Sequence, residues 1–161
     1  VGTMDRPKVK LGGGGGGCNI TATIKALTVW TTRHRSGRTL VEECDFITDI
    51  GHVTPAGTRE ELGFSGGGPQ WLVTELGVFD YDDQKRARLV QLFPDVTLDE
   101  VRAATGFTFD VAGALRHVPP PSRAELALVR SVDPLGIRRT EFDQRDLDRT
   151  FTHEHAAACT C

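Results

Sequence analysis

Residues 8–27, KVKLGGGGGGCNITATIKAL, contain an unbroken run of six glycines, Gly12 to Gly17, between two segments with apolar residues. The run is preceded by a strand-like stretch and followed by a possible helix. Ordering six glycines costs about 3 to 6 kcal/mol more than ordering six alanines, which is large against a net stability of roughly 5 to 15 kcal/mol. Glycine exposes backbone without a Cβ, so N–H groups can approach a ligand closely. The pattern therefore predicts a strand, a ligand-facing loop and a helix.

A flexible linker is the alternative interpretation of this run, because glycine tracts also connect segments without contacting anything. Residues 1–17 would then be a tail ahead of the domain that follows.

Length and composition limit the class of protein. A chain of 161 residues with 39% hydrophobic and 25% charged residues fits one globular domain. The net charge of -3 gives no basic surplus for nucleic acid or an anionic membrane. No apolar stretch approaches the roughly 18 residues of a membrane span, and no secretory signal is visible. The four cysteines lack paired spacing, so we expect reduced thiols and a cytoplasmic protein.

The periodicity and turn residues predict an α/β domain with a mixed, mostly parallel sheet and flanking helices. Strands are expected at 26–32 (buried), 39–48 and 71–81, the last paired in a hairpin with 87–93. Capping boxes predict a very short helix from Thr58 to Gly63 and longer helices beginning at Thr97 and Ser122. The domain is expected to cover residues 1–139, and the charged residues 140–161 to form a polar, poorly ordered tail.

The glycine run also satisfies the dinucleotide-binding pattern Gly-x-Gly-x-x-Gly at Gly12, Gly14 and Gly17. Glu42 or Glu43 lies at about the distance of a ribose-binding acid. The match is weak, because six consecutive glycines satisfy any glycine pattern. A phosphate-binding P-loop fits less well, because Cys18 and Asn19 follow the run where Lys and Ser/Thr would be required.

Three other features are candidates for chemistry. Glu75, among apolar residues, is a possible nucleophile or base, or a carboxylate on a polar face or at a strand end. Cys18 is either a thiol with a lowered pKa at a helix start or a small residue fitting a tight turn. A soft-ligand cluster near the C-terminus matches no structural zinc motif, so no metal site is predicted; its members are His153, His155, Cys159 and Cys161.

Five segments in the same order resemble the C-terminal part of the β subunit of the family I CoA transferases, nearest to the glutaconate CoA-transferase-like branch. The resemblance spans about Pro7 to Ile137. The segments are KVKLGGGGGGCNI, ECDFITDIGHVTPAGTREELG, GGGPQWLVTELGVFDYD, LFPDVTLDEVRAATGF and PPPSRAELALVRSVDPLGI.

This resemblance implies the α/β fold of the CoA-transferase superfamily and an α-subunit partner, usually in an α2β2 assembly. Family members move CoA between acyl groups through a glutamyl-CoA thioester, with CoA as substrate and no other cofactor, and related members hydrolyse acyl-CoAs. The glycine loop lies near the thioester in the family. Gly13, Gly15 and Gly16 align with recurrent glycines and are the oxyanion-side candidates. Gly14, Gly17 and Asn19 are the candidates for binding CoA.

Departures from the family pattern bear on activity. Family members commonly have Pro at the position of Gly12 and an acidic residue at that of Asn19. Their catalytic glutamate lies N-terminal to the glycine loop, where this chain has only residues 1–11, and Glu75 aligns with a different acidic position. We therefore expect an N-terminally incomplete subunit, either a fragment or a degenerate relative. Alternatives are a non-catalytic CoA- or partner-binding module and part of an acyl-CoA hydrolase; a nicotinamide-dependent oxidoreductase would depend on the glycine run alone.

Overall fold

The computed structural model describes residues 5–6 and 13–142. A five-stranded mixed sheet in the order β1-β4-β5-β6-β7 forms its centre. The strands are β1 (Leu27–Trp30), β4 (Pro69–Val73), β5 (Gly77–Tyr81), β6 (Ala87–Leu92) and β7 (Asp110–His117). A small hairpin, β2 (Val53–Thr54) with β3 (Gly57–Thr58), lies outside this sheet. The helices are α1 (Gly17–Thr23), α2 (Leu98–Ala104) and α3 (Arg123–Val132), with short 3-10 turns η1 (His34–Ser36) and η2 (Ile137–Glu141).

The mixed sheet with flanking helices confirms the predicted fold class. Its pairings are evenly divided, however, because β1–β4 and β6–β7 are parallel while β4–β5 and β5–β6 are antiparallel. The expectation of a mostly parallel sheet is therefore corrected in this detail. The antiparallel pairs come from a β4-β5-β6 meander, and each outer strand is then added in parallel.

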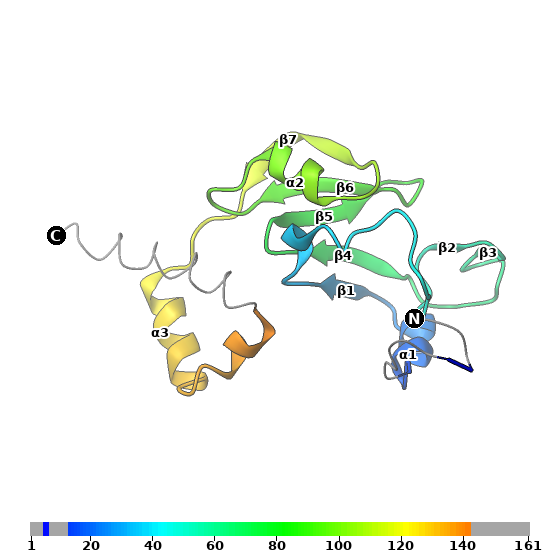
Figure 1. Cartoon of the computed structure of the whole chain (residues 1–161), viewed down its shortest axis with the longest axis horizontal. Helices are drawn as coiled ribbons and strands as arrows, with labels where there is room; N and C mark the ends of the chain where they lie inside the picture. Colours follow the sequence, from blue (N-terminus) through cyan, green and yellow to red (C-terminus); the bar gives the residue numbers. More distant parts are fainter. Residues whose placement is uncertain (1–4, 7–12, 143–161) are drawn as a thin grey trace.

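The core lies between one face of the sheet and α2, which crosses over β6 and β7 (Figure 1). Alternate residues of the strands point to this face, as strand geometry requires, and α2 adds Val101 and Ala104. The buried side chains are Leu72, Leu76, Phe79, Leu89, Leu92, Val96, Val101 and Ala104. By contrast, α3 has no buried residue and lies apart from the sheet.

The predicted strand 71–81 is two strands joined by a tight turn. Thr74 ends β4, because its buried hydroxyl oxygen accepts the N–H groups of Leu76 at 3.1 Å and Gly77 at 3.0 Å. A Cβ on Gly77 would lie 2.6 Å from the carbonyl oxygen of Gln91, so the start of β5 requires glycine. The predicted hairpin of β5 with residues 87–93 is confirmed.

Residues 39–48 were predicted as a strand, which is wrong for this structure. This segment runs beside the loop after α2 without pairing in the sheet, and the N–H of Gly106 donates to the carbonyl of Leu40 at 2.7 Å. A Cβ on Gly106 would lie 3.0 Å from the Cα of Val41. Close backbone packing at this glycine thus replaces a β ladder.

Two further expectations need correction. The strand expected to be buried at 26–32 forms β1, but three of its four residues are exposed because it lies at the sheet edge. The capping box at Thr58 forms its hydrogen bonds with Glu61, yet the chain makes only a turn before Gly63, whose φ is +77°. The helices at Thr97 and Ser122 are confirmed with complete capping boxes.

The expected polar tail lies largely outside the described residues, apart from 140–142, where η2 ends. Within the described ranges, no helix has the length and apolar content needed to cross a bilayer.

Candidate functional site

The glycine run folds into a turn that leads directly into α1. The N–H of Gly17 donates to the carbonyl of Gly14 at 2.9 Å, and the N–H of Ile20 donates to that of Gly16 at 3.0 Å. Gly15 has φ +54°, a conformation that a side chain would strain. The predicted loop followed by a helix is therefore present, while Gly12 and the expected strand before it lie outside the described residues.

Three of the glycines face open space. Of the residues that the structure describes, none would lie within 4 Å of a Cβ on Gly13 or Gly15, and a Cβ on Gly16 would reach only the tip of Ile20 at 4.0 Å. Within residues 13–142, the N–H groups of Gly15 and Gly16 have no hydrogen-bond partner. Among the described residues, these backbone donors are therefore unoccupied.

The other two glycines of the turn face a neighbouring loop. A Cβ on Gly14 would lie 3.4 Å from that of Thr48, and one on Gly17 would lie 3.2 Å from Oδ1 of Asp49. The Thr21 hydroxyl also lies 3.3 Å from this Asp49 oxygen. Asn19, the remaining predicted CoA-binding residue, is exposed on α1. Gly14 and Gly17 therefore let residues 48–49 pack against the turn.

Sequence reasoning missed Arg59, a buried guanidinium behind the turn. It is only 5% exposed, and its hydrogen bonds to the described residues all go to backbone carbonyls. Its Nε donates to the carbonyl of Gly66 at 2.8 Å. Its Nη1 donates to the carbonyls of Gly51 at 3.0 Å and Ile50 at 3.3 Å, and its Nη2 to those of Thr21 at 2.6 Å and Ala22 at 3.0 Å. The sequence signal was an arginine just ahead of a second glycine cluster.

This second cluster, Gly66 to Gly68, brings the backbone close to the end of α1. A Cβ on Gly66 would lie 2.5 Å from the carbonyl oxygen of Ile24 and 2.8 Å from Nη2 of Arg59. A Cβ on Gly67 would lie 2.5 Å from the carbonyl oxygen of Lys25, again too close. Because these glycines have no side chain, they leave room for the backbone that follows α1 and for the Arg59 guanidinium.

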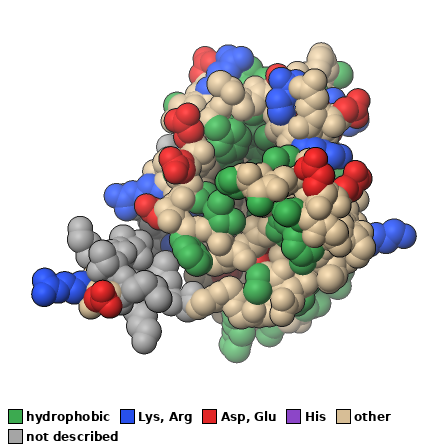
Figure 2. All heavy atoms as spheres, turned by 90° about the vertical axis from the view of Figure 1, so that its right-hand side faces the viewer, with side chains coloured by type: hydrophobic (Ala, Val, Ile, Leu, Met, Phe, Trp, Pro, Cys, Tyr) green, Lys and Arg blue, Asp and Glu red, His purple; other side chains and the backbone are tan. Residues whose placement is uncertain are grey.

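The face that carries α1 and the β2–β3 hairpin also exposes hydrophobic side chains (Figure 2). Ile20 on α1 and Val53 on β2 are exposed, and so are Phe46 and Ile47 in the loop that precedes the hairpin. Phe46 and Ile47 directly precede the two residues that pack against the glycine turn. The turn is thus flanked by apolar as well as polar groups.

Two curated CoA-transferases contain subunits similar to this chain, although no family model matches it. The B subunit of the 3-oxoadipate CoA-transferase from Pseudomonas knackmussii is 30% identical over 134 residues, covering 83% of this chain and 51% of the relative. The B subunit of the glutaconate CoA-transferase from Acidaminococcus fermentans is 33% identical over 137 residues, covering 83% and 50%.

Solved structures agree with these relatives. The crystal structure of glutaconate CoA-transferase from Acidaminococcus fermentans superposes with a TM-score of 0.67 at 27% identity, covering 89% of this chain and 51% of that chain. Rhodococcus jostii IpdAB gives a TM-score of 0.70 at 26% identity, covering 89% and 57%. In sequence and fold, the chain is similar to the β subunits of family I CoA transferases. It spans about half the length of the curated relatives it matches.

Glu75 of this β-subunit-like chain lies in the β4–β5 turn and binds η1. Its Oε2 accepts the N–H of His34 at 3.0 Å, and its Oε1 accepts that of Arg35 at 2.7 Å. The carboxylate thus caps two backbone donors, which agrees with the structural interpretation of Glu75 at a strand end.

His34 is fully buried beneath this cap. The Thr105 hydroxyl donates to the carbonyl of Val101 at 2.7 Å, so its oxygen accepts Nε2–H of His34 at 2.9 Å. Nδ1 is then the acceptor and lies 3.1 Å from the Thr74 hydroxyl, whose proton is shared with the carbonyl oxygen of Gly77, also at 3.1 Å. Burial lowers the pKa of His34, against the opposing effect of Glu75. A neutral imidazole with both nitrogens bonded is a core residue of the β-subunit-like fold.

The remaining candidates of the β-subunit-like chain do not form a second site. Cys18 is an exposed free thiol, 3.5 Å from the carbonyl oxygen of Gly15. Glu42 and Glu43 are exposed in the irregular segment 39–52. The described residues contain no group of three or more His, Cys, Asp or Glu placed to hold a metal. The C-terminal His and Cys cluster lies outside them.

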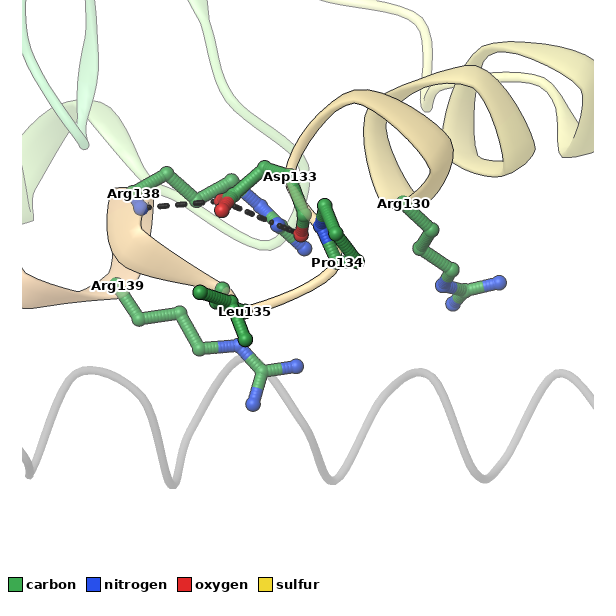
Figure 3. Close-up of a pocket in the computed structure, with 7 residues that line it drawn as sticks. Arg130, Asp133, Pro134, Leu135, Arg138 and Arg139 are labelled. Carbon is green, nitrogen blue, oxygen red and sulfur yellow. Dashed lines mark hydrogen bonds and ion pairs between the residues drawn. The ribbon is translucent and has the colours of Figure 1, made fainter.

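A pocket far from the glycine turn lies at the end of α3 (Figure 3). Asp133 organises its wall by accepting the N–H of Ile137 at 2.8 Å and Nη1 of Arg138 at 2.8 Å. Arg130 and Arg139 also line it and have further interactions of their own. Because α1 and α3 lie at opposite sides of the molecule, this pocket is separate from the turn.

Proposed function

We propose that this chain is part of the β subunit of an acyl-CoA:carboxylate CoA-transferase and contributes its glycine-rich thioester loop. The observation that carries the proposal is the turn at Gly13 to Gly16, where the N–H groups of Gly15 and Gly16 have no hydrogen-bond partner within residues 13–142 and the glycines bring no side chain of their own. The named CoA-transferase relatives supply the reaction class.

In the proposed reaction, a carboxylate attacks the acyl-CoA carbonyl, and the carbonyl oxygen gains negative charge as the new bond forms. Backbone N–H groups of Gly13, Gly15 and Gly16 donate to this oxygen and lower the barrier. Here the attacking carboxylate is that of the catalytic glutamate, and collapse of the intermediate breaks the C–S bond to give an acyl-glutamyl anhydride and CoA thiolate. The thiolate then attacks the glutamyl carbonyl of this anhydride, which forms the glutamyl-CoA thioester and releases the acyl group as its free carboxylate. Asn19, exposed on α1, borders the approach of CoA, which acts as substrate with no other cofactor, while Gly14 and Gly17 make room for the loop packed beside the turn.

The catalytic glutamate of this proposal comes from outside the 161 residues, because no glutamate here occupies the position of the family nucleophile. An α subunit completes the site, and we propose an α2β2 assembly. The acyl group is left open, since the pocket that selects it is formed partly by another chain.

The test is CoA exchange by the reconstituted assembly. The chain is mixed with an α subunit and a polypeptide that supplies the glutamate, and CoA transfer from an acyl-CoA to a free carboxylate is measured. Transfer is expected only in the complete mixture. Full activity of this chain alone would contradict the proposal.

A pair of glycine variants makes this test specific to the turn. Gly15 and Gly37 both have positive φ, at +54° and +66°, and a Cβ on either meets nothing within 4 Å. Gly15→Ala and Gly37→Ala therefore introduce similar backbone strain. We expect Gly15→Ala to lower kcat about 100-fold, the low end of the range for losing an oxyanion donor, and Gly37→Ala to leave kcat nearly unchanged. Equal losses would refute the role of the turn.

Hydrolysis is the second candidate function. It is favoured by the similarity of this chain to the IpdB subunit of a cholesterol ring-cleaving hydrolase from Mycobacterium tuberculosis. That protein is 32% identical over 144 residues, covering 87% of this chain and 55% of the relative. Free CoA released without an acceptor carboxylate would indicate hydrolysis, whereas release that depends on the acceptor would indicate transfer. Tight calorimetric binding of CoA without either reaction would indicate a binding module.

A further inference from the structure

We propose that Arg59 is a positioning residue that holds the glycine turn at Gly13 to Gly16 in place from behind. The proposal rests on the proposed function for its catalytic consequence, but its structural part stands on the contacts of Arg59 alone.

The guanidinium joins the two segments that flank the turn. Nη2 binds the carbonyls of Thr21 and Ala22 in the last turn of α1, the helix that the glycine turn opens. Nη1 binds the carbonyls of Ile50 and Gly51, which directly follow the Thr48–Asp49 pair packed against Gly14 and Gly17. One side chain therefore fixes α1 and its neighbouring loop relative to each other.

Charge explains why these contacts are strong. Within the described residues, no carboxylate lies within hydrogen-bond distance of the buried guanidinium, so backbone carbonyl dipoles alone compensate its charge. Hydrogen bonds from a charged donor are shorter and roughly twice as strong as neutral ones. Leaving such a charge unpaired in the interior is costly, so displacement of either flanking segment is opposed.

Arginine is the side chain that fits this position. Its planar fork offers five N–H donors in fixed directions, and the carbonyl acceptors lie around it on three segments. Lysine has three donors on one flexible ammonium and cannot reach all of these acceptors together. Gly66 is part of the same arrangement, since a Cβ there would lie 2.8 Å from Nη2.

Movement of α1 would shift the open N–H groups of Gly15 and Gly16, because the helix is hydrogen-bonded to the turn. The N–H of Ile20 donates to the carbonyl of Gly16, and the N–H of Gly17 donates to the carbonyl of Gly14. Oxyanion stabilisation is sensitive to such shifts, and misplacement of a reacting group by about 1 Å can reduce a rate about 100-fold. Arg59 thus acts on the reaction through the turn without touching substrate.

The test uses Arg59→Lys, with Arg88→Lys as the matched control. Arg88 pairs with Asp80 through two hydrogen bonds of 2.9 and 2.7 Å on the sheet, away from the turn. By NMR hydrogen exchange, Arg59→Lys is expected to speed exchange of the α1 amides, including Ile20 and Ile24, about tenfold or more, the factor for 1.4 kcal/mol. Amides of β5 and β6 should change less than about threefold. Arg88→Lys should leave the α1 amides unchanged.

Unchanged α1 exchange in Arg59→Lys, or an equal rise in α1 and the sheet, would overturn the positioning role. If that variant does not fold, hydrogen exchange in the unsubstituted chain still tests the positioning role of Arg59. Nε–H of Arg59 should exchange slowly and together with the Ile20 and Ile24 amides, whereas exchange as fast as that of Nε–H in the partly buried Arg88 would refute the proposal.

The reconstituted enzyme separates this proposal from the proposed function. Arg59→Lys should lower kcat about tenfold or more per folded molecule, with KM changed less than about threefold, while Arg88→Lys leaves both unchanged. An unaltered kcat alongside faster α1 exchange would overturn the catalytic part. An inactive unsubstituted assembly would refute the proposed function, and the exchange measurements would then still decide the structural role of Arg59.

Discussion

His34 shows how a single titratable side chain can link folding to pH. Burial lowers its pKa, Glu75 raises it and Arg35 lowers it, with burial dominant. The folded protein therefore resists protonation of His34 more than the unfolded chain does. Between the unfolded value near 6.5 and the lower folded value, the unfolded state binds more protons, so stability falls as pH falls.

We expect the free energy of unfolding contributed by His34 to be fully present above about pH 6.5 and to decrease below it. His34→Gln, which keeps hydrogen-bonding groups but cannot titrate, should flatten this slope. His52, whose pKa burial also lowers, contributes to the same slope, so His34→Gln/His52→Gln should flatten it further. Urea unfolding from pH 5 to 8 checks this. An identical pH slope in His34→Gln and the unsubstituted chain would contradict the assignment.

The helices illustrate what the sequence can and cannot predict at the scale of elements. Thr97 and Ser122 marked their helix starts correctly, because a capping box is formed by neighbouring residues and needs no distant partner. The strand β7 was missed, because its place is set by parallel pairing with β6 across the α2 crossover. The same limit hid Arg59, whose acceptors include carbonyls 37 and 38 positions away in sequence.

The two capping boxes also give a matched comparison of helices. In both, the cap oxygen accepts the N–H of a glutamate three residues on, at 3.3 Å for Thr97 and 3.2 Å for Ser122. The α2 helix buries Val101 and Ala104 in the core, whereas α3 buries no residue. Loss of the cap should therefore affect global unfolding only for α2.

We expect Thr97→Ala to lower the free energy of unfolding by about 1 kcal/mol, the usual value of an N-cap. Ser122→Ala should loosen α3 locally and leave the unfolding of the sheet within about 0.5 kcal/mol of the unsubstituted chain. Thr97→Ser keeps the cap hydroxyl and serves as the conservative control. Denaturant titration with tryptophan fluorescence measures all three, and equal losses for Thr97→Ala and Ser122→Ala would show that burial does not separate the helices.

At the scale of the whole molecule, the described residues leave one edge of the sheet uncovered. β1 is the edge strand beside β4, and its residues Leu27 to Trp30 carry no charge. Val29 is 39% and Trp30 61% exposed, and Trp71 on the neighbouring strand is 43% exposed. Edge strands are usually protected by charges, proline or a covering element. This edge is therefore suited to pairing with another chain.

We expect the isolated chain to self-associate at micromolar concentrations through this edge, because strand pairing and apolar burial both favour contact there. Val29→Lys places a charge on the edge and should weaken association about tenfold, equivalent to 1.4 kcal/mol. Gln84→Lys adds the same charge in the exposed β5–β6 turn and should leave association unchanged. Sedimentation velocity over a concentration series distinguishes these cases. A monomer at every concentration, or equal effects of the two lysines, would show that β1 is not the contact.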